Sequence, residues 1–171
     1  MMHAKVVDGV IVSRERKTNP TSATSSDGGP VWRPIVEDDK PTFDDTQDLT
    51  RSEVIEASQV RIAWTVSDKA LEQAKADRIR KINKEAGARI LAIMPEYKQR
   101  NALALGLNLT LDHGPDVSAW PADAKIAYAA YSALWSAISD VRTASNASVA
   151  LIEAANDVAG VRSVDVVWPS A

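Results

Sequence analysis

The stretch VRIAWTVSDKALEQAKADRIRKI, residues 60–82, decides the fold because its hydrophobic period changes in the middle. Up to Val66, apolar residues recur at every second position, which is typical of a half-buried β-strand. From Leu71 onward, apolar residues recur at the three- and four-residue spacings of an amphipathic helix. The sequence therefore predicts an α+β protein with a small antiparallel β-sheet module, residues 1–66, followed by an α-helical region, residues 67–171.

Several local patterns predict the strands of the N-terminal module. Asp8-Gly9 stands between two β-branched runs, which is typical of a two-residue β-hairpin. Residues 31–36, VWRPIV, predict a short strand, and Pro34 is expected to confine it to a sheet edge because proline cannot donate to a strand ladder. Residues 53–55 are expected to turn back against the strand that follows them. An antiparallel sheet of about four or five strands results.

Two further segments of the module are predicted to be loops. Ten of the thirteen residues 18–30 are Ser, Thr, Gly or Pro, which predicts a long loop. Residues 37–48 contain six acids: Glu37, Asp38, Asp39, Asp44, Asp45 and Asp48. A solvated acidic loop is the preferred interpretation of residues 37–48, with calcium binding as the alternative, because the spacing of the acids matches no EF-hand.

The helical region is predicted to contain long helices whose apolar stripes are buried by packing against another helix. Ser67 is the expected N-cap of a helix of about 27 residues that ends before Pro95. A short helix is expected to stop at Gly106, with a loop over residues 107–118. The last helix is predicted to begin at Pro121 and to reach about 35 residues. Helices of this length predict a helical hairpin or an oligomeric bundle, followed by an extended apolar C-terminal tail.

Two groups of side chains are candidates for packing and contact. The helical core or subunit interface is predicted to consist of Ile79, Ile82, Ile90, Ile93, Leu134, Ile138 and Val141. Trp32, Trp120 and Trp168 each lie within two residues of a proline and are candidate docking residues. Trp64 and Trp135 are instead expected in the core.

The chain carries none of the common catalytic motifs, and no enzyme activity is expected. It has no cysteine, and neither of its two histidines, His3 and His113, has a second histidine at the helical spacing of a zinc site. His113 beside Asp112 allows an acid–base pair, although a solvated loop is the preferred interpretation. We therefore expect no catalytic residue, no cofactor and no bound metal.

The charge distribution argues against nucleic acid as a partner. Nine Lys or Arg and four Asp or Glu lie between Lys69 and Arg100, but the chain has a net charge of −3 and the basic residues are not interleaved with aromatics. A solvated basic face opposite the apolar stripe is the preferred interpretation. No apolar run approaches the roughly 20 residues of a membrane span, so no membrane contact is expected, and the N-terminus lacks the apolar region of a signal peptide.

Several segments together resemble a known class of proteins. They are KVVDGVIV (5–12), VWRPIVEDDKPTFD (31–44), VRIAWTV (60–66), INKEAGARILAIMPEYKQRN (82–101), YSALWSAISDVR (131–142) and VDVVWP (164–169). Their order resembles small bacteriophage tail proteins associated with tail fibres, including tail assembly chaperones that finish in a Trp-Pro tail. Residues 18–30 and the Ala-rich last helix depart from the short forms of this class.

This resemblance implies a non-enzymatic structural component of a phage tail, associated with the tail fibre or the tail tip and acting through protein–protein contacts. Its implied partners are other tail proteins and further copies of itself, with a trimer favoured. Its implied location is the virion tail, after synthesis in the bacterial cytoplasm. The alternative is a tail-fibre assembly chaperone that is absent from the mature virion.

Overall fold

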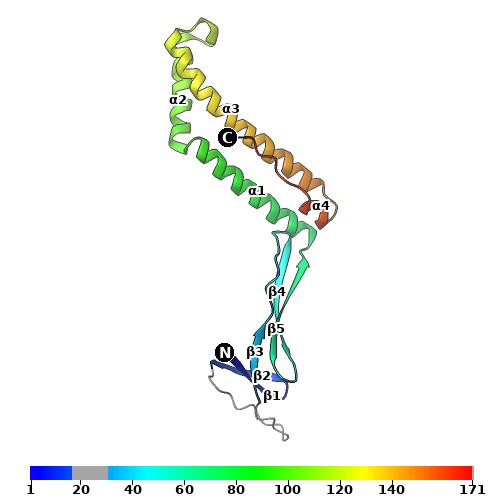
Figure 1. Ribbon diagram of the computed structural model, residues 1–171. Coiled ribbons are helices and arrows are strands. Elements are labelled where there is room, and N and C mark those ends of the chain that lie inside the picture. Colours follow the sequence, from blue (N-terminus) through cyan, green and yellow to red (C-terminus); the bar gives the residue numbers. More distant parts are fainter. Residues whose placement is uncertain (17–30, 171) are drawn as a thin grey trace. The chain divides into compact units, whose positions relative to one another are not determined.

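The computed structural model describes residues 1–16 and 31–170 (Figure 1). The chain divides into two compact units, Met1–Lys69 and Ala70–Ala171. The loop predicted for residues 18–30 lies outside the described residues.

The N-terminal unit is one curled, five-stranded sheet. Its strands are β1 (Met2–Val7), β2 (Val10–Arg16), β3 (Val31–Glu37), β4 (Gln47–Ile55) and β5 (Val60–Asp68), in the order β2-β1-β3-β5-β4. Strands β3 and β5 pair in parallel and the other neighbours pair antiparallel. The prediction of an antiparallel sheet was therefore wrong. Alternating hydrophobicity marks the strands but does not specify their neighbours, and here β5 rather than β4 returns beside β3.

The position of Pro34 corrects a second expectation, because β3 is an internal strand and not an edge. Pro34 lies opposite His3, at the end of the ladder between β1 and β3. The ladder between β3 and β5 begins one residue later, at Ile35. Pro34 therefore occupies the point where β3 exchanges one neighbour for the other, and its missing N–H is tolerated there.

Both predicted hairpins are confirmed. Asp8 and Gly9 have φ angles of 48° and 75°, the positive values that a tight two-residue turn between twisted strands requires. They connect Val7 to Val10, which are paired in the ladder between β1 and β2. Strands β4 and β5 pair along their full length.

Each of the five strands contributes to a small apolar core. Its members are Ala4, Val6 and Val60, which are buried, and Ile11, Ile35 and Ile55, which are partly buried against them. Because every strand supplies a residue to one cluster, the sheet curls around that cluster as a half-barrel.

The C-terminal unit contains three long helices and a short one. They are α1 (Leu71–Ile93), α2 (Glu96–His113), α3 (Ala122–Ala154) and α4 (Val158–Arg162), with the 3₁₀ turn η1 (Val117–Ala119) before α3. Helix α3 runs back alongside α1 (Figure 1). The predicted helical hairpin was therefore wrong, because α2 stands between the two helices as a full helix of 18 residues.

The helix boundaries explain this difference. Helix α2 continues through Gly106 to His113, where the sequence predicted a stop and a loop. One glycine costs a helix about 1 kcal/mol, and the leucine- and alanine-rich residues around it favour the helix strongly enough to offset that cost. At the other end, Ser67 belongs to β5 rather than to a helix cap, and Ala70 is the N-cap of α1.

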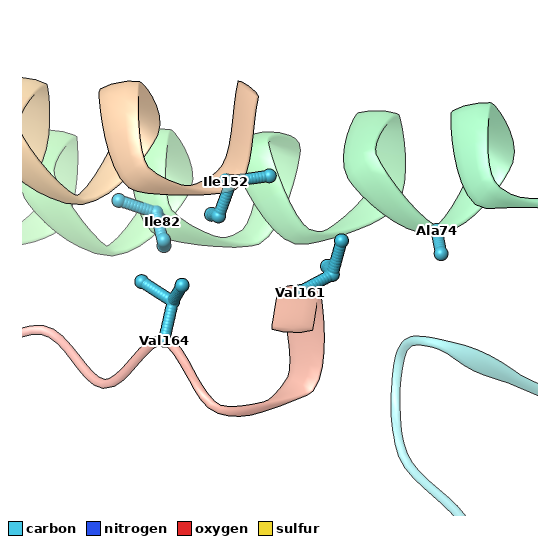
Figure 2. Close-up of a cluster of buried hydrophobic side chains, with 5 residues drawn as sticks. All are labelled: Ala74, Ile82, Ile152, Val161 and Val164. Atoms are coloured by element: carbon cyan, nitrogen blue, oxygen red, sulfur yellow. The ribbon is translucent and has the colours of Figure 1, made fainter. Parts of the chain in front are cut away.

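Two apolar clusters hold the helices together. Figure 2 shows the first, in which Ala74 and Ile82 of α1, Ile152 of α3, Val161 of α4 and Val164 of the C-terminal tail are buried. The second comprises Met94, Ala102 and Ile138 with partly buried neighbours. Among the described residues, none of the helices combines the length and apolarity needed to cross a membrane.

Candidate interaction surface

Helix α2 is apolar on two of its sides. On the side toward α3, Ala102 is buried and Leu109 is half-buried. Farther around the helix, Leu103, Leu107 and Leu111 are 62%, 61% and 73% exposed, and the first two border a groove beside α3. Residues four apart stack along one helix face, so these three leucines form a continuous exposed row, which we call the leucine stripe. An exposed apolar row on a helix is the usual mark of a contact with another protein.

The segments of α2 and α3 that form this part of the surface carry no charged side chain. Residues 101–111 of α2 and residues 126–139 of α3 contain no Asp, Glu, Lys or Arg. Within the α3 segment, Ile126 is 72% exposed and Leu134 is 38% exposed. A helix segment without charges on any side is normally covered by protein, because exposed helix faces are otherwise polar.

An open groove lies between α2 and α3 within this charge-free region. Its volume is about 430 Å³. Leu107 and Leu109 line it from α2, and Tyr128, Tyr131 and Trp135 line it from α3. Large aromatic side chains with hydroxyl and indole groups at an open surface are typical of protein contacts.

The turn between α2 and α3 is held by contacts of Trp120 and Asp116. Trp120 is only 3% exposed, its Nε1 donates to the backbone oxygen of Gly114 at 2.9 Å, and its ring meets Tyr128 edge-on at 5.4 Å. Asp116 accepts hydrogen bonds from Ser118, and these lower the pKa of its carboxyl. Trp120 is therefore a structural residue of the turn, not the docking residue that its neighbouring proline suggested.

The predicted helical stripe is largely covered within one chain. Ile82, Ile138 and Val141 are buried, and of the seven only Leu134 is exposed. The half-buried members pack around the two clusters already described: Ile79 at the first, Ile90 and Ile93 at the second. Most of this stripe is thus a core between α1 and α3, and its burial requires no second subunit.

The C-terminal tail also finds its contacts inside the chain. The ring of Trp168 lies 4.8 Å from the guanidinium of Arg89, and Trp168 packs against the first apolar cluster. Arg78 donates to the backbone oxygen of Val164 at 2.6 Å. The third candidate docking residue, Trp32, is half-buried on β3 and is paired with Lys5 of β1.

The remaining candidate groups serve local roles. In the acidic segment, Asp38 pairs with Arg61 at 2.8 Å, and Asp44 accepts hydrogen bonds from the backbone and hydroxyl of Thr46. Within residues 1–16 and 31–170, no three His, Cys, Asp or Glu side chains gather closely enough to hold a metal ion. His113 lies at the end of α2 with its ring 6.0 Å from that of Trp120.

On the basic helix, the cations pair mainly with acids one turn away. Arg80 lies 2.7 Å from Asp77 and Arg89 lies 2.8 Å from Glu85, both on α1. Pairs of this kind are typical of a solvated helix face.

The leucine stripe was missed in the sequence because Gly106 was interpreted as a helix stop. The signal was present as leucines at positions 103, 107 and 111, the spacing of one helix face. Comparison with family models, curated proteins and solved structures adds nothing to this interpretation. None of the three comparisons found a match for this chain.

Proposed function

We propose that this chain is a non-enzymatic structural component of a bacteriophage tail, associated with the tail fibre or tail tip, that acts through protein–protein contacts. The charge-free surface of α2 and α3, with its leucine stripe, is the observation that supports a contact role most directly. The phage tail is proposed as the location because the sequence resembles small tail proteins. The proposed partners are other tail proteins and further copies of the chain, and the proposed location is the virion.

The proposal is tested by quantitative mass spectrometry of purified, mature particles of the phage that encodes the chain, with a known tail protein as the reference for copy number. Several copies per particle are expected. Leu107→Ser should lower the copy number because it interrupts the leucine stripe. Leu151→Ser is the matched control. Leu151 is also 61% exposed, but it lies near the C-terminal end of α3, outside the charge-free segment 126–139.

A tail-fibre assembly chaperone is the second candidate. The open groove of about 430 Å³ between α2 and α3 favours it, because a chaperone needs an accessible apolar site for its client. Its signature in the same experiment is absence from mature particles together with abundance in the infected-cell lysate. That result would overturn the structural proposal.

A further inference from the structure

We propose that the groove between α1 and α3 that holds the C-terminal tail, residues 163–170, is a peptide-binding site that also takes the C-terminal tail of a second copy of this chain. Two copies that exchange their tails become linked. This inference goes beyond the proposed function because it names a binding site and its ligand. Neither the leucine stripe nor a place in the virion is a premise of it.

The C-terminal tail runs back from α4 along the helices as an extended segment (Figure 1). Every second side chain packs inward: Val164 is 8% exposed, and Val166 and Trp168 are half-buried against the first apolar cluster. The side chains between them face the solvent, since the Asp165 side chain is 95% exposed and Val167 is 87% exposed. A period of two is how an extended peptide presents one face to a surface. Three inward side chains therefore hold the tail in the groove.

Two arginines of α1 add polar contacts to the tail. Arg78 donates from Nη2 to the backbone oxygen of Val164 at 2.6 Å and lies 3.6 Å from the carboxylate of Asp165. The guanidinium of Arg89 lies 4.8 Å from the centroid of the Trp168 ring. The groove therefore favours a segment with an apolar residue at every second position, an acid after the first of them and a tryptophan as the last.

Side chains rather than a backbone ladder attach the tail to the groove. Within residues 165–170, no backbone group forms a hydrogen bond with the backbone of the described chain. The tail also leaves space unfilled. A gap of about 260 Å³ remains between α1 and the tail beside Val166, and beyond Pro169 the space between α1 and α3 stays open over about 480 Å³. A segment held in this way separates at a small part of the free energy of global unfolding.

The tail of a second copy fits the site because it carries the same side chains in the same order. It would make the contacts that the structure shows within one chain, so the exchange requires no new complementarity. The tail of the same chain is present at a high effective concentration and competes with it. Exchange is therefore expected where copies are concentrated, as they are in an assembly.

A labelled peptide tests the site on the full chain. The peptide has the sequence of residues 163–170, SVDVVWPS, with fluorescein at its N-terminus and an amidated C-terminus, and fluorescence anisotropy measures its binding. The wild-type chain should bind it weakly, because its own tail occupies the groove. Trp168→Ala in the chain should raise the affinity for the peptide about tenfold, since it weakens the competing tail and leaves the groove unchanged. A merely structural role of Trp168 predicts no gain.

Variants of the peptide show which side chains the groove recognises. They are measured against the Trp168→Ala chain, with circular dichroism as the check that its helices are intact. Trp168→Ala in the peptide should weaken binding about tenfold. Asp165→Lys in the peptide should weaken it about threefold, because it places a cation beside Arg78. Val167→Ala is the matched peptide control and should bind unchanged, since Val167 faces the solvent.

A second chain variant keeps the test decisive where Trp168→Ala disturbs the fold. Val166→Ala also removes an inward side chain of the competing tail, by a smaller change. It should raise the affinity for the unmodified peptide about threefold.

Sedimentation equilibrium tests the exchange between copies. The wild-type chain should associate at high concentration to twice its mass of 18.5 kDa, and an excess of the peptide should suppress this association. The peptide with Trp168→Ala should not suppress it. Suppression by one peptide and not by the other distinguishes exchange of the tails from association through another surface.

Three results would overturn the inference. They are a folded Trp168→Ala chain that binds no peptide, equal binding of the peptide and its Trp168→Ala variant, and a wild-type chain that is a monomer at every concentration. The proposed function is judged separately by the copy number in particles. A chain that is present in particles but binds no peptide leaves the phage-tail role standing and removes only the exchange of C-terminal tails.

Discussion

The guanidinium of Arg14 on β2 lies 2.5 Å from the carboxylate of Glu53 on β4, although β2 and β4 form opposite edges of the five-stranded sheet. The two edges approach each other because the sheet curls around its shared apolar core. Arg51, a neighbour on β4, also donates to Glu53 at 2.8 Å. This contact places a charged cluster across the two edges, a position where exposed backbone groups otherwise invite pairing with other chains.

The edge-to-edge pair should make the β unit sensitive to acid. The hydrogen bond from Arg14 is the main cause that lowers the pKa of Glu53. A carboxylate whose pKa is lowered on folding contributes stability that is complete above its unfolded-state pKa and is lost as the pH falls through its folded-state pKa. The contribution should therefore be present at neutral pH and disappear in the acid range.

An NMR titration of the Glu53 side chain measures this effect. Arg14→Gln should raise the titration midpoint of Glu53 and reduce the free energy of unfolding at pH 7 by about 0.5 kcal/mol, the size of a partly exposed ion pair. Arg16→Gln, the same charge change two residues along β2, is the control. An unchanged midpoint in Arg14→Gln would contradict the pairing.

Ile82→Asp should destabilise the helical unit rather than merely separate subunits. Ile82 is 3% exposed in the cluster between α1, α3 and the tail, so the substitution would bury an unpaired carboxylate and cost at least about 3 kcal/mol. Urea unfolding followed by far-ultraviolet circular dichroism measures the loss. Leu134 belongs to the same predicted stripe but is 38% exposed. Leu134→Asp should therefore lower the free energy of unfolding by about 1 kcal/mol or less. Equal losses would mean that the two sites are equally buried.

Gly106→Ala should stabilise the protein by about 0.5–1 kcal/mol. A Cβ at Gly106 would meet no atom within 4 Å, and the residue is inside a helix, where alanine is preferred. Gly114→Ala is the contrasting variant, since the φ of Gly114 is 83° and alanine is strained there. Thermal unfolding should shift upward for the first and downward for the second. A downward shift for Gly106→Ala would indicate that α2 is not a continuous helix.

Trp168→Ala should weaken the packing of the C-terminal tail against α1. It removes the ring that packs on α1 and contacts Arg89, at an expected cost of about 1–2 kcal/mol. Hydrogen exchange of the α1 and tail amides should accelerate. Val167→Ala is the neighbouring control because Val167 is 87% exposed. If both variants exchange alike, the tail contact contributes nothing.

The sequence by itself determined the local elements. The Asp8-Gly9 pair favoured a hairpin because both residues tolerate the positive φ angles that the turn requires. The change of period after Val66 separated strands from helices. The spacing of Ile82 and Ile138 also identified positions that avoid water. Each of these properties depends on residues close together in the chain.

Only the tertiary structure decided what covers each apolar face. It placed β5 beside β3, and Pro34 between two ladders. It also buried Trp120 in a turn and left Leu107 exposed, although both are large apolar side chains. Hydrophobic periodicity shows which side of an element avoids water, but the neighbour that excludes the water from Trp120 or Ile82 comes from a distant part of the chain.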